Sequence, residues 1–222
     1  MKIIFEDNHI IVVEKQTNIP VQSDSSKDMS LLEEVKAYLK VKYNKPGNVY
    51  LGLVHRLDRP VGGVMVFAKT SKAASRLSEQ IRKNEFQKIY IAIVNGKLDK
   101  EKDILENYLL KSKKTNTSAV VEDNTGKYAK LEYELIEYNA KENLSLLKIK
   151  LHTGRHHQIR VQLANIGHSI YGDQRYGRLQ EKKQIALWAH QLEFTHPVTK
   201  EQIRFISKPD NIGIWAEFEI IN

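Results

Sequence analysis

Short runs of β-branched and other apolar residues, joined by turn-like segments, constrain the fold of this chain most strongly. Such runs occur at residues 3–5, 10–13, 64–68, 86–95, 129–138, 144–151, 186–194 and 201–209. Several connections between them are polar and short, as hairpin turns are. We therefore predict an α+β fold, with a mainly antiparallel mixed sheet and a few flanking helices.

Three stretches have helical character. Ser30 is a predicted N-cap, and Glu33 three residues later completes a capping-box pattern. A second helix is predicted over residues 71–82 with Ser71 as its cap. A third, short helix is predicted to end at Gly167. The pattern thus places few helices among many strands.

Residues 97–127 are rich in Lys, Asn, Asp and Thr, with only short apolar interruptions. We expect an excursion of short strands and mobile loops there. No internal repeat or linker divides the chain, and 222 residues suffice for one substantial core. The sequence therefore predicts a single domain over residues 1–222.

The charge balance narrows the class of partner. The chain has 35 Lys and Arg against 27 Asp and Glu, a net charge of +8, which favours a polyanion partner. It has no cysteine, which excludes disulfides, a thiol nucleophile and a thiolate zinc site. No signal-peptide pattern and no apolar run of roughly 20 residues is present. We expect a cytoplasmic protein without a membrane partner.

One acid has an unusual setting. Asp58 lies in VHRLDRPVGG, between an apolar lead-in and the predicted strand at residues 64–68. It is either a solvated turn residue or a carboxylate held ionised for chemistry by guanidinium groups. Arg56 and Arg59 flank it, but neighbours in an extended segment point apart. A charged partner should therefore come from elsewhere in the chain.

Two further side chains allow both a structural and a functional interpretation. Arg160 falls within the apolar register of the third helix, and arginines are rarely buried unless paired, so an anionic partner is implied. Tyr90 shares one face of its strand with Lys88. A tyrosine there can be a core residue, or it can stack on a nucleic-acid base.

The histidines favour hydrogen bonding over metal binding. No HExxH motif or carboxylate cluster accompanies the candidates, which are His152, His156, His157, His168, His190 and His196. No glycine-rich phosphate-binding loop is present either. The sequence therefore predicts neither a metal nor a nucleotide cofactor.

Four segments, taken in order, resemble the RluA-type RNA pseudouridine synthases over nearly the whole chain. VHRLDRPVGGVMVFAKT is similar to the family's HRLD segment, and KIYIAIVNG to its Lys-x-Tyr strand. LHTGRHHQIRVQLANIGHSIYGDQRYG resembles the TGRxHQIR to GHPIxGDxxYG block, and ALWAHQLEFTHPVTKEQIRF the closing segment. One departure is Arg59-Pro60-Val61-Gly62-Gly63, where relatives have a charged residue and then Thr-Ser-Gly.

The resemblance implies an RNA-modifying isomerase that needs no cofactor. It implies two sublobes around a central RNA-binding cleft, with Asp58 catalytic, Tyr90 stacking on the base and Arg160 pairing with Asp58. The predicted RNA-binding residues are Arg56, Arg59, Lys88, Arg155, His156 and Gln158. The expected substrate is specific uridine in ribosomal or transfer RNA. We expect a monomer without an obligate protein partner and without an N-terminal S4-type domain.

Two other functions remain open on the residues alone. One is a non-catalytic RNA-binding protein that retains the basic surface. The other is a phosphodiester-cleaving enzyme that uses His156 or His157. The retention of Asp58, Tyr90 and Arg160 together favours isomerisation over binding alone. Asp58 is also the single convincing acid, whereas a glycosidase normally needs two carboxylates.

Overall fold

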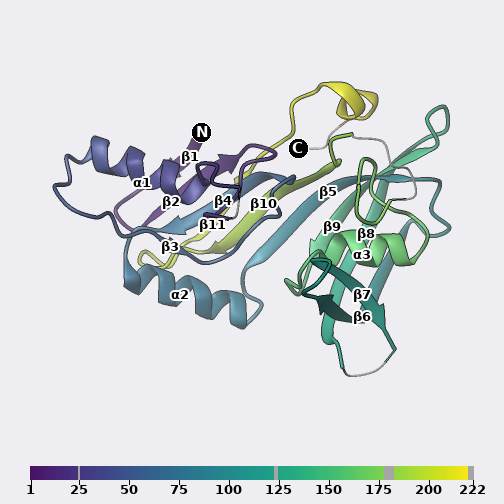
Figure 1. Ribbon diagram of the computed structural model, residues 1–222, viewed down its shortest axis with the longest axis horizontal. Helices are drawn as coiled ribbons and strands as arrows, with labels where there is room; N and C mark the ends of the chain where they lie inside the picture. Colours follow the sequence, from purple (N-terminus) through teal and green to yellow (C-terminus); the bar gives the residue numbers. More distant parts are fainter. Residues whose placement is uncertain (25, 123–124, 178–182, 220–222) are drawn as a thin grey trace. The chain divides into compact units, whose positions relative to one another are not determined.

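A computed structural model describes residues 1–24, 26–122, 125–177 and 183–219 (Figure 1). The chain divides into two compact units. Unit 1 comprises Met1–Gln87 and Ala189–Ser207, and unit 2 comprises Lys88–Trp188 with the C-terminal segment from Lys208. The described part contains eleven strands and three α-helices. None of these helices has the length and apolar composition that would let it cross a membrane.

Unit 1 is built on antiparallel strand pairs with two helices. Its strands are β1 (Lys2–Glu6), β2 (Ile10–Lys15), β3 (Gly52–Leu53), β4 (Gly62–Ala68), β10 (Leu187–Thr195) and β11 (Gln202–Ile206). β2 pairs with β1 and β4, β3 with β4, and β11 with β10, each antiparallel. The helices are α1 (Leu31–Lys42) and α2 (Ser71–Arg82). The first two residues of β10 belong to unit 2.

The core of unit 1 lies between its strands and α2. Its members, which are at most 3% exposed, are Ile10, Val12, Val64, Val66, Ala68, Ala73, Leu77, Phe86, Leu192 and Phe194. Two of them, Ala73 and Leu77, project from one side of α2, which explains the amphipathic pattern of that helix. This core supports β4, the strand that follows the His-Arg-Leu-Asp segment.

The two predicted helix caps have different outcomes. The capping box at α1 is confirmed: Ser30 N–H donates to Glu33 Oε2 at 2.9 Å, and Glu33 N–H donates to Ser30 Oγ at 3.3 Å. The cap predicted at Ser71 is wrong by one residue. Thr70 is extended and its Oγ1 accepts the Ala73 N–H at 3.2 Å, so Ser71 is the first helical residue.

Unit 2 contains a run of five antiparallel strands, in the order β5–β9–β8–β6–β7. The elements are β5 (Gln87–Asn95), β6 (Lys102–Ser112), β7 (Thr117–Val121), β8 (Lys127–Asn139), β9 (Leu144–Leu151), α3 (Gln158–Asn165) and the 3-10 helix η1 (Gly213–Glu217). One apolar cluster comprises Ile91, Ile93, Leu144, Leu146, Ala186, Trp188, Trp215 and Phe218. In a second cluster Val161 of α3 packs on Leu109 and Ala129.

The predicted α+β class with a mainly antiparallel sheet is confirmed, since the pairs β1–β2, β2–β4, β3–β4, β10–β11, β5–β9, β8–β9, β6–β8 and β6–β7 are all antiparallel. The expectation of short strands and mobile loops at residues 97–127 is wrong for β6, which is 11 residues long. It pairs along most of its length with β8, and this pairing stabilises the strand despite its polar sequence. Residues 123–124 lie outside the described residues. The single domain and the central cleft stay predictions.

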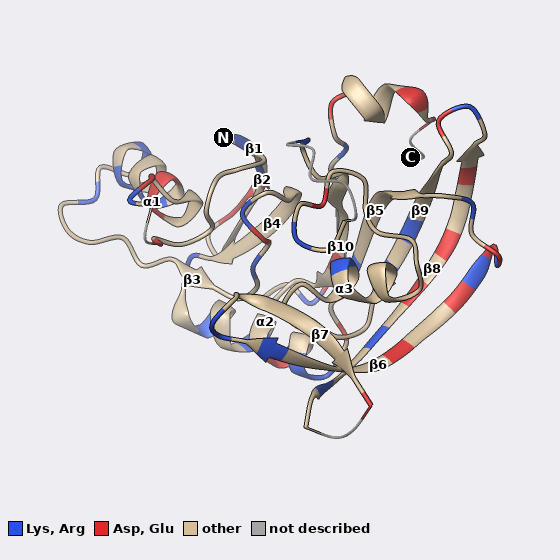
Figure 2. Cartoon of the chain, turned by 45° about the vertical axis from the view of Figure 1, so that its right-hand side comes forward, with Lys and Arg blue, Asp and Glu red and all other residues tan. Residues whose placement is uncertain are grey.

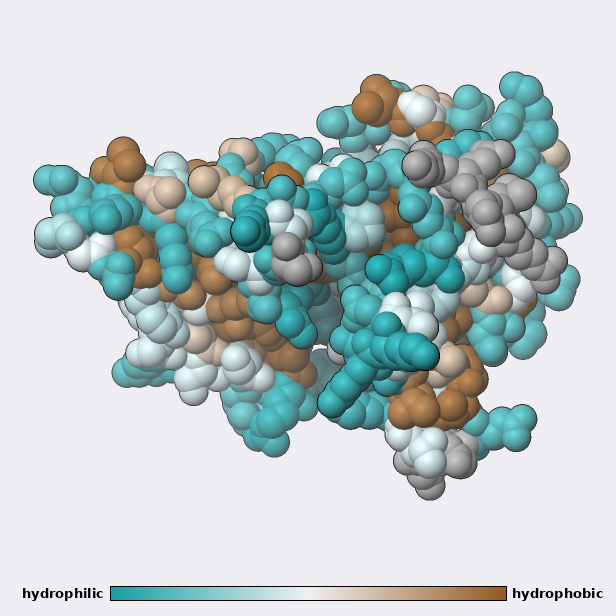
Figure 3. Space-filling model, in the orientation of Figure 1, coloured by the Kyte–Doolittle hydropathy of each residue, from teal (hydrophilic) through white to brown (hydrophobic). Residues whose placement is uncertain are grey.

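The β6–β8 ribbon has a balanced surface. Acidic and basic positions are interspersed along both strands (Figure 2). Lys102 pairs with Glu134 at 2.6 Å, and Lys130 with Glu106 at 3.2 Å. Three exposed large hydrophobic side chains lie among them, namely Ile104, Leu110 and Tyr128. Figure 3 shows hydrophobic surface on this part of unit 2. The net positive charge of the protein is therefore not concentrated on this ribbon.

Candidate active site

The segment around Asp58 lies in unit 1, between β3 and β4, and hydrogen bonds fix its course. His55 Nε2 accepts the Val66 N–H at 3.1 Å, which attaches the start of the segment to β4. The Asp58 carbonyl accepts the Val61 N–H at 3.0 Å, which closes a turn. Asp58 is half-buried in this turn. The sequence-based placement of this acid between the apolar lead-in and the buried strand β4 is thus confirmed.

Lys15, at the end of β2, supports the same turn from the interior. Its side chain is fully buried, and its Nζ donates to the carbonyls of Gln16, Arg59 and Val61 at 3.0, 2.9 and 2.7 Å. Burial lowers the pKa of Lys15 to about 7, although the charge of Asp58 acts in the opposite direction. Asp58 is therefore within electrostatic reach of Lys15. Sequence reasoning did not include Lys15 in the site, although a lysine two residues after the apolar run IIVV was a usable signal.

Gly63 explains part of the unusual RPVGG segment. Its φ of +125° is a conformation that side chains of L-residues rarely adopt. A Cβ at this position would lie 2.2 Å from the carbonyl oxygen of Ala189. The close approach of β4 and β10 therefore requires glycine here, whatever side chains the preceding residues have.

The two arginines beside Asp58 differ in their surroundings. Arg59 is exposed, donates from Nε to the Asn18 carbonyl at 3.1 Å, and forms salt bridges with Asp24 and Asp28. It thereby holds the polar loop that precedes α1. Arg56 is exposed and forms no salt bridge within the described part of the chain. The predicted binding of RNA by both arginines stays a prediction.

Arg160 is a buried side chain of α3 in unit 2, as its position in the apolar register indicated. It is 4% exposed, and it donates to Asp173 through two parallel hydrogen bonds, Nε to Oδ2 at 2.8 Å and a terminal nitrogen to Oδ1 at 2.7 Å. The predicted pairing of Arg160 with Asp58, which belongs to the other unit, stays a prediction. Sequence reasoning took YGDQRYG only as a loop and missed Asp173.

Asp173 is held ionised although it is only 2% exposed. Burial alone would raise the pKa of this carboxyl, but the hydrogen bonds and charge of Arg160 outweigh it and lower the pKa below its usual value. The backbone N–H groups of Arg175 and Tyr176 also donate to Oδ1, at 2.9 and 3.2 Å. Asp173 thus fixes the direction of the Arg160 guanidinium.

Tyr176 connects three parts of unit 2. Its ring centroid lies 5.3 Å from Cζ of Arg160. Its hydroxyl accepts the Ser118 N–H of β7 at 2.7 Å and lies 2.8 Å from His157 Nδ1. His156 is stacked on His157, with ring centroids 3.8 Å apart, and its Nδ1 lies 3.0 Å from Ser118 Oγ. His156 therefore contacts β7, and His157 contacts the loop after α3.

Tyr90 lies in the middle of β5 and is 8% exposed. Its partner in the register with β9 is Ile149. Lys88, two residues earlier, is half-buried near the turn that leads to α3. The two residues are therefore on the same face of the strand.

The other histidines form pairwise contacts. His152 Nε2 lies 2.7 Å from Glu132 Oε1, and the Nδ1 atoms of His168 and His190 face the carbonyls of Asn95 and Ser207 at 2.9 and 2.8 Å. Within the described ranges, no group of three or more His, Asp or Glu side chains is suitably placed to hold a metal ion.

A family model and two related sequences identify the same kind of protein. Residues 9–165 match the family model for RNA pseudouridylate synthase. An uncharacterised RNA pseudouridine synthase of Bacillus subtilis is 34% identical over 207 residues, which cover 91% of this chain and 67% of the relative. Ribosomal large subunit pseudouridine synthase D of Zymomonas mobilis is 32% identical over 217 residues, with 92% and 68% covered.

A solved structure supports the fold. Human RNA pseudouridylate synthase domain containing 4 superposes with a TM-score of 0.80 at 19% identity, covering 97% of this chain and 90% of the human one. At this identity the likeness concerns the fold alone. It places the α+β arrangement of strands and helices described above among known architectures.

Proposed function

This chain belongs to the RluA-type family of RNA pseudouridine synthases, and from that premise we propose that Asp58 is its catalytic carboxylate. The reaction is an isomerisation of uridine in RNA. It breaks the bond between N1 of uracil and C1′ of ribose and forms a bond between C5 and C1′. The C5 proton leaves and N1 gains a proton, so no atom is added overall. No step requires a redox partner or a group donor.

The environment of the Asp58 turn is the observation that carries this proposal. The carboxylate belongs to the first residue of a turn closed by the Val61 N–H, and a buried lysine supports this turn. Lys15 Nζ donates to the carbonyls of Arg59 and Val61 and so holds the turn that carries the carboxylate in place. An ionised and fixed carboxylate is needed in either of two mechanisms: attack on C1′ or removal of the 2′ proton.

We assign supporting roles to Tyr90 and Arg160. The target base has to leave the RNA stack, which costs roughly a few kcal/mol, and a tyrosine ring can hold it by stacking. The Tyr90 hydroxyl is also a group through which the C5 proton can leave. Arg160 would pair with Asp58 while Asp173 fixes its guanidinium.

The substrate class follows from the relatives. Synthase D of Zymomonas mobilis and synthase C of Haemophilus ducreyi are named for the ribosomal large subunit. We propose that this chain likewise modifies uridine in ribosomal RNA, with transfer RNA as the alternative. A net charge of +8 suits both.

RNA cleavage by His156 and His157 is less well supported. The Nδ1 atoms of the two histidines lie at hydrogen-bond distance from Ser118 and Tyr176, which gives each imidazole a structural role. A histidine-dependent nuclease needs one imidazole as base and one as acid on opposite sides of a phosphate. Here the rings are stacked, with centroids 3.8 Å apart.

The test is a comparison of cellular RNA from a strain that lacks this gene. The strain is complemented with wild type, with Asp58→Asn or with Asp210→Asn, an exposed acid as matched control. Pseudouridines are mapped by carbodiimide labelling and primer extension. We expect one or a few sites to return with wild type and Asp210→Asn only. Restoration by Asp58→Asn would refute the assignment of Asp58.

A further inference from the structure

A cluster of hydrogen-bond donors lies where β5 begins and where the turn before α3 passes it. Lys88 is half-buried at the start of β5. Gly154 has no side chain, and a Cβ placed there would lie only 3.5 Å from Lys88 Nζ. The lysine ammonium therefore lies against the exposed backbone of the turn. Arg155, the next residue, is also exposed.

Gln158, the first residue of α3, has an unsatisfied donor at this turn. Its Oε1 accepts from Thr153 Oγ1 at 2.7 Å and from the Arg155 N–H at 3.0 Å. These two donors fix the orientation of the amide. The side chain is 3% exposed, and its Nε2 has no hydrogen-bond partner among the described residues. A buried donor left unpaired costs about 1–3 kcal/mol, so its retention needs an explanation.

The charges at the turn are also uncompensated. Arg155 donates from Nε to the Tyr128 carbonyl at 2.7 Å, which fixes its guanidinium without neutralising it. Neither Lys88 nor Arg155 forms a salt bridge within the described part of the chain. Burial lowers the pKa of Lys88, and the charge of Arg155 lowers it further. The positive end of the α3 dipole adds to this potential. An anion bound here would relieve both costs.

We propose that Lys88, Arg155 and the Gln158 amide form a binding site for one phosphate group of the RNA backbone. The ammonium, the guanidinium and the amide supply donors that match the acceptor oxygens of a phosphate. The proposal rests on the proposed function, since RNA modification brings a phosphodiester backbone to the protein. Free inorganic phosphate has the same chemistry and is distinguished by the test.

The site has a defined relation to the proposed base-stacking residue. Lys88 and Tyr90 lie two residues apart on one face of β5, which corresponds to about 7 Å along a strand. A phosphate on Lys88 therefore belongs to the target nucleotide or to its neighbour. The site would fix the backbone on one side of the flipped base.

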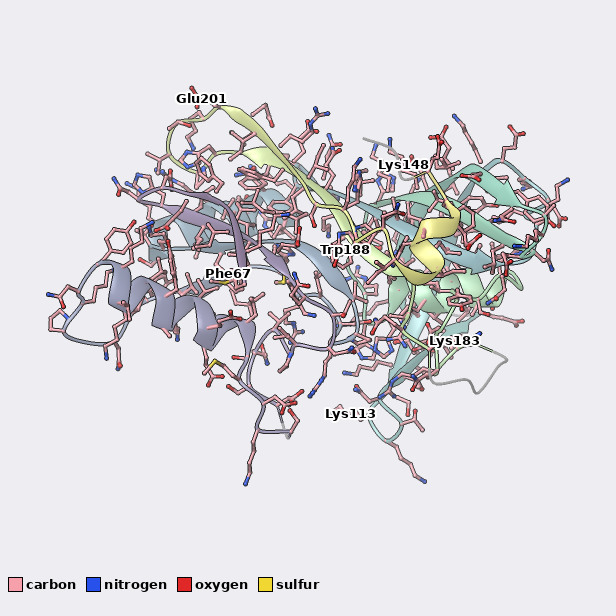
Figure 4. The ribbon with its side chains drawn as sticks, turned by 90° about the horizontal axis from the view of Figure 1, so that it is seen from above. Phe67, Lys113, Lys148, Lys183, Trp188 and Glu201 are labelled. Carbon is pink, nitrogen blue, oxygen red and sulfur yellow. The ribbon has the colours of Figure 1, made fainter. Side chains whose placement is uncertain are left out.

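Two variants and a control test this site. Lys88→Met removes one charge with little change in volume. Gln158→Glu keeps the Oε1 acceptor and replaces the donor by an oxygen that repels phosphate. Lys148→Met is the matched control: Lys148 of β9, labelled in Figure 4, pairs with Ile91 and thus lies on the opposite face of the sheet.

The measurement is the affinity for a labelled, uridine-containing 20-nucleotide RNA as a function of KCl concentration. For each variant we expect weaker binding and a slope of log K against log[salt] that is smaller by about 0.7, the value for one phosphate contact on a single strand. Lys148→Met should retain the wild-type slope. Wild-type affinity and slope in both Lys88→Met and Gln158→Glu would overturn the proposal.

A second measurement localises the phosphate. In a series of the same RNA, each member has one linkage replaced by a neutral methylphosphonate. At one linkage, the neutral replacement should weaken RNA binding by wild type but not by Lys88→Met. Equal losses in both proteins at every linkage would overturn the site. A second result would also overturn the site: millimolar inorganic phosphate competes with RNA for the wild-type protein, while neither variant changes RNA binding. The site would then bind free phosphate only.

Pseudouridine formation is measured separately from RNA binding. Pseudouridine formation by wild type and Lys148→Met on RNA from the deletion strain tests the proposed function itself. If both proteins modify RNA while the Lys88 and Gln158 variants bind as wild type does, only the phosphate site fails. If neither protein modifies RNA, the proposed function fails independently of the binding data.

Discussion

Arg160 and Asp173 are joined by two nearly equal hydrogen bonds, of 2.8 and 2.7 Å, in a pair whose side chains are at most 5% exposed. Such bidentate geometry fixes both the position and the plane of a guanidinium. The pair connects α3 to the loop after it. Asp173 is thus a positioning residue for the arginine that we assign to the active site.

We predict that Asp173→Asn slows turnover and destabilises unit 2. Replacement of the carboxylate by an amide removes the charge of Asp173 that compensates the buried Arg160 guanidinium, which costs about 3 kcal/mol. The value of kcat should fall at least tenfold while KM for RNA changes little. The checks are steady-state kinetics and urea unfolding. Rescue of kcat by Asp173→Glu is expected. A variant with lower stability and normal kcat would contradict the positioning role.

Tyr176→Phe should separate the hydroxyl from the ring. The variant keeps the ring beside Arg160 but leaves the Ser118 N–H without its acceptor, for a loss of about 1–2 kcal/mol in the free energy of unfolding. Tyr176→Leu should lose more stability and also lower kcat, since the contact with the guanidinium disappears. Thermal unfolding and kinetics of both variants provide the measurement. Equal kcat in the two variants would show that the ring does not act on Arg160.

Lys15 predicts a pH dependence of stability. Its folded-state pKa of about 7 lies below the ordinary value of 10.5, so between these values the unfolded chain binds more protons. Stability should therefore rise with pH across this window, by up to about 1.4 kcal/mol per pH unit. Below pH 7 the penalty for the buried charge is fully present.

The comparison with Lys15→Met isolates this contribution. Urea unfolding of both proteins at pH 6, 7, 8 and 9 should show a rise in wild type that is absent or much reduced in the variant. Other titrating groups act equally on both proteins, so the difference between the two curves is the relevant quantity. Parallel curves would mean that Lys15 keeps its ordinary pKa in the folded protein.

Gly63→Ala should prevent stable folding. The substitution combines a strained φ with a Cβ 2.2 Å from the Ala189 carbonyl oxygen, and backbone cannot move away as a flexible side chain can. We expect a loss of more than about 3 kcal/mol in the free energy of unfolding. Gly47→Ala is the control, because no heavy atom lies within 4 Å of a Cβ there. Similar melting temperatures for the two variants would contradict this interpretation.

Much of the fold was visible in local patterns. The capping box at Ser30 acts over three residues, and the strand that contains Tyr90 follows from its apolar run. The error at Ser71 has a simple cause, since neighbouring Thr and Ser are both good caps and only the backbone conformation distinguishes them. The length of β6 was missed because a polar strand is stabilised by its partner, which sequence periodicity does not identify.

The candidate active site, like the fold, was predicted from the sequence only in part. Motif order along the chain was enough to assign the family and to nominate Asp58, Tyr90 and Arg160. Only the folded chain identified three further features of the site. They are the partner of Arg160 within unit 2, the support of the Asp58 turn by Lys15, and the Gln158 amide nitrogen that has no hydrogen-bond partner among the described residues. Asp173 is 13 residues from Arg160, and Lys15 is 46 residues from Val61. Hydrogen bonds and ion pairs depend on distances in space, which local sequence patterns do not encode.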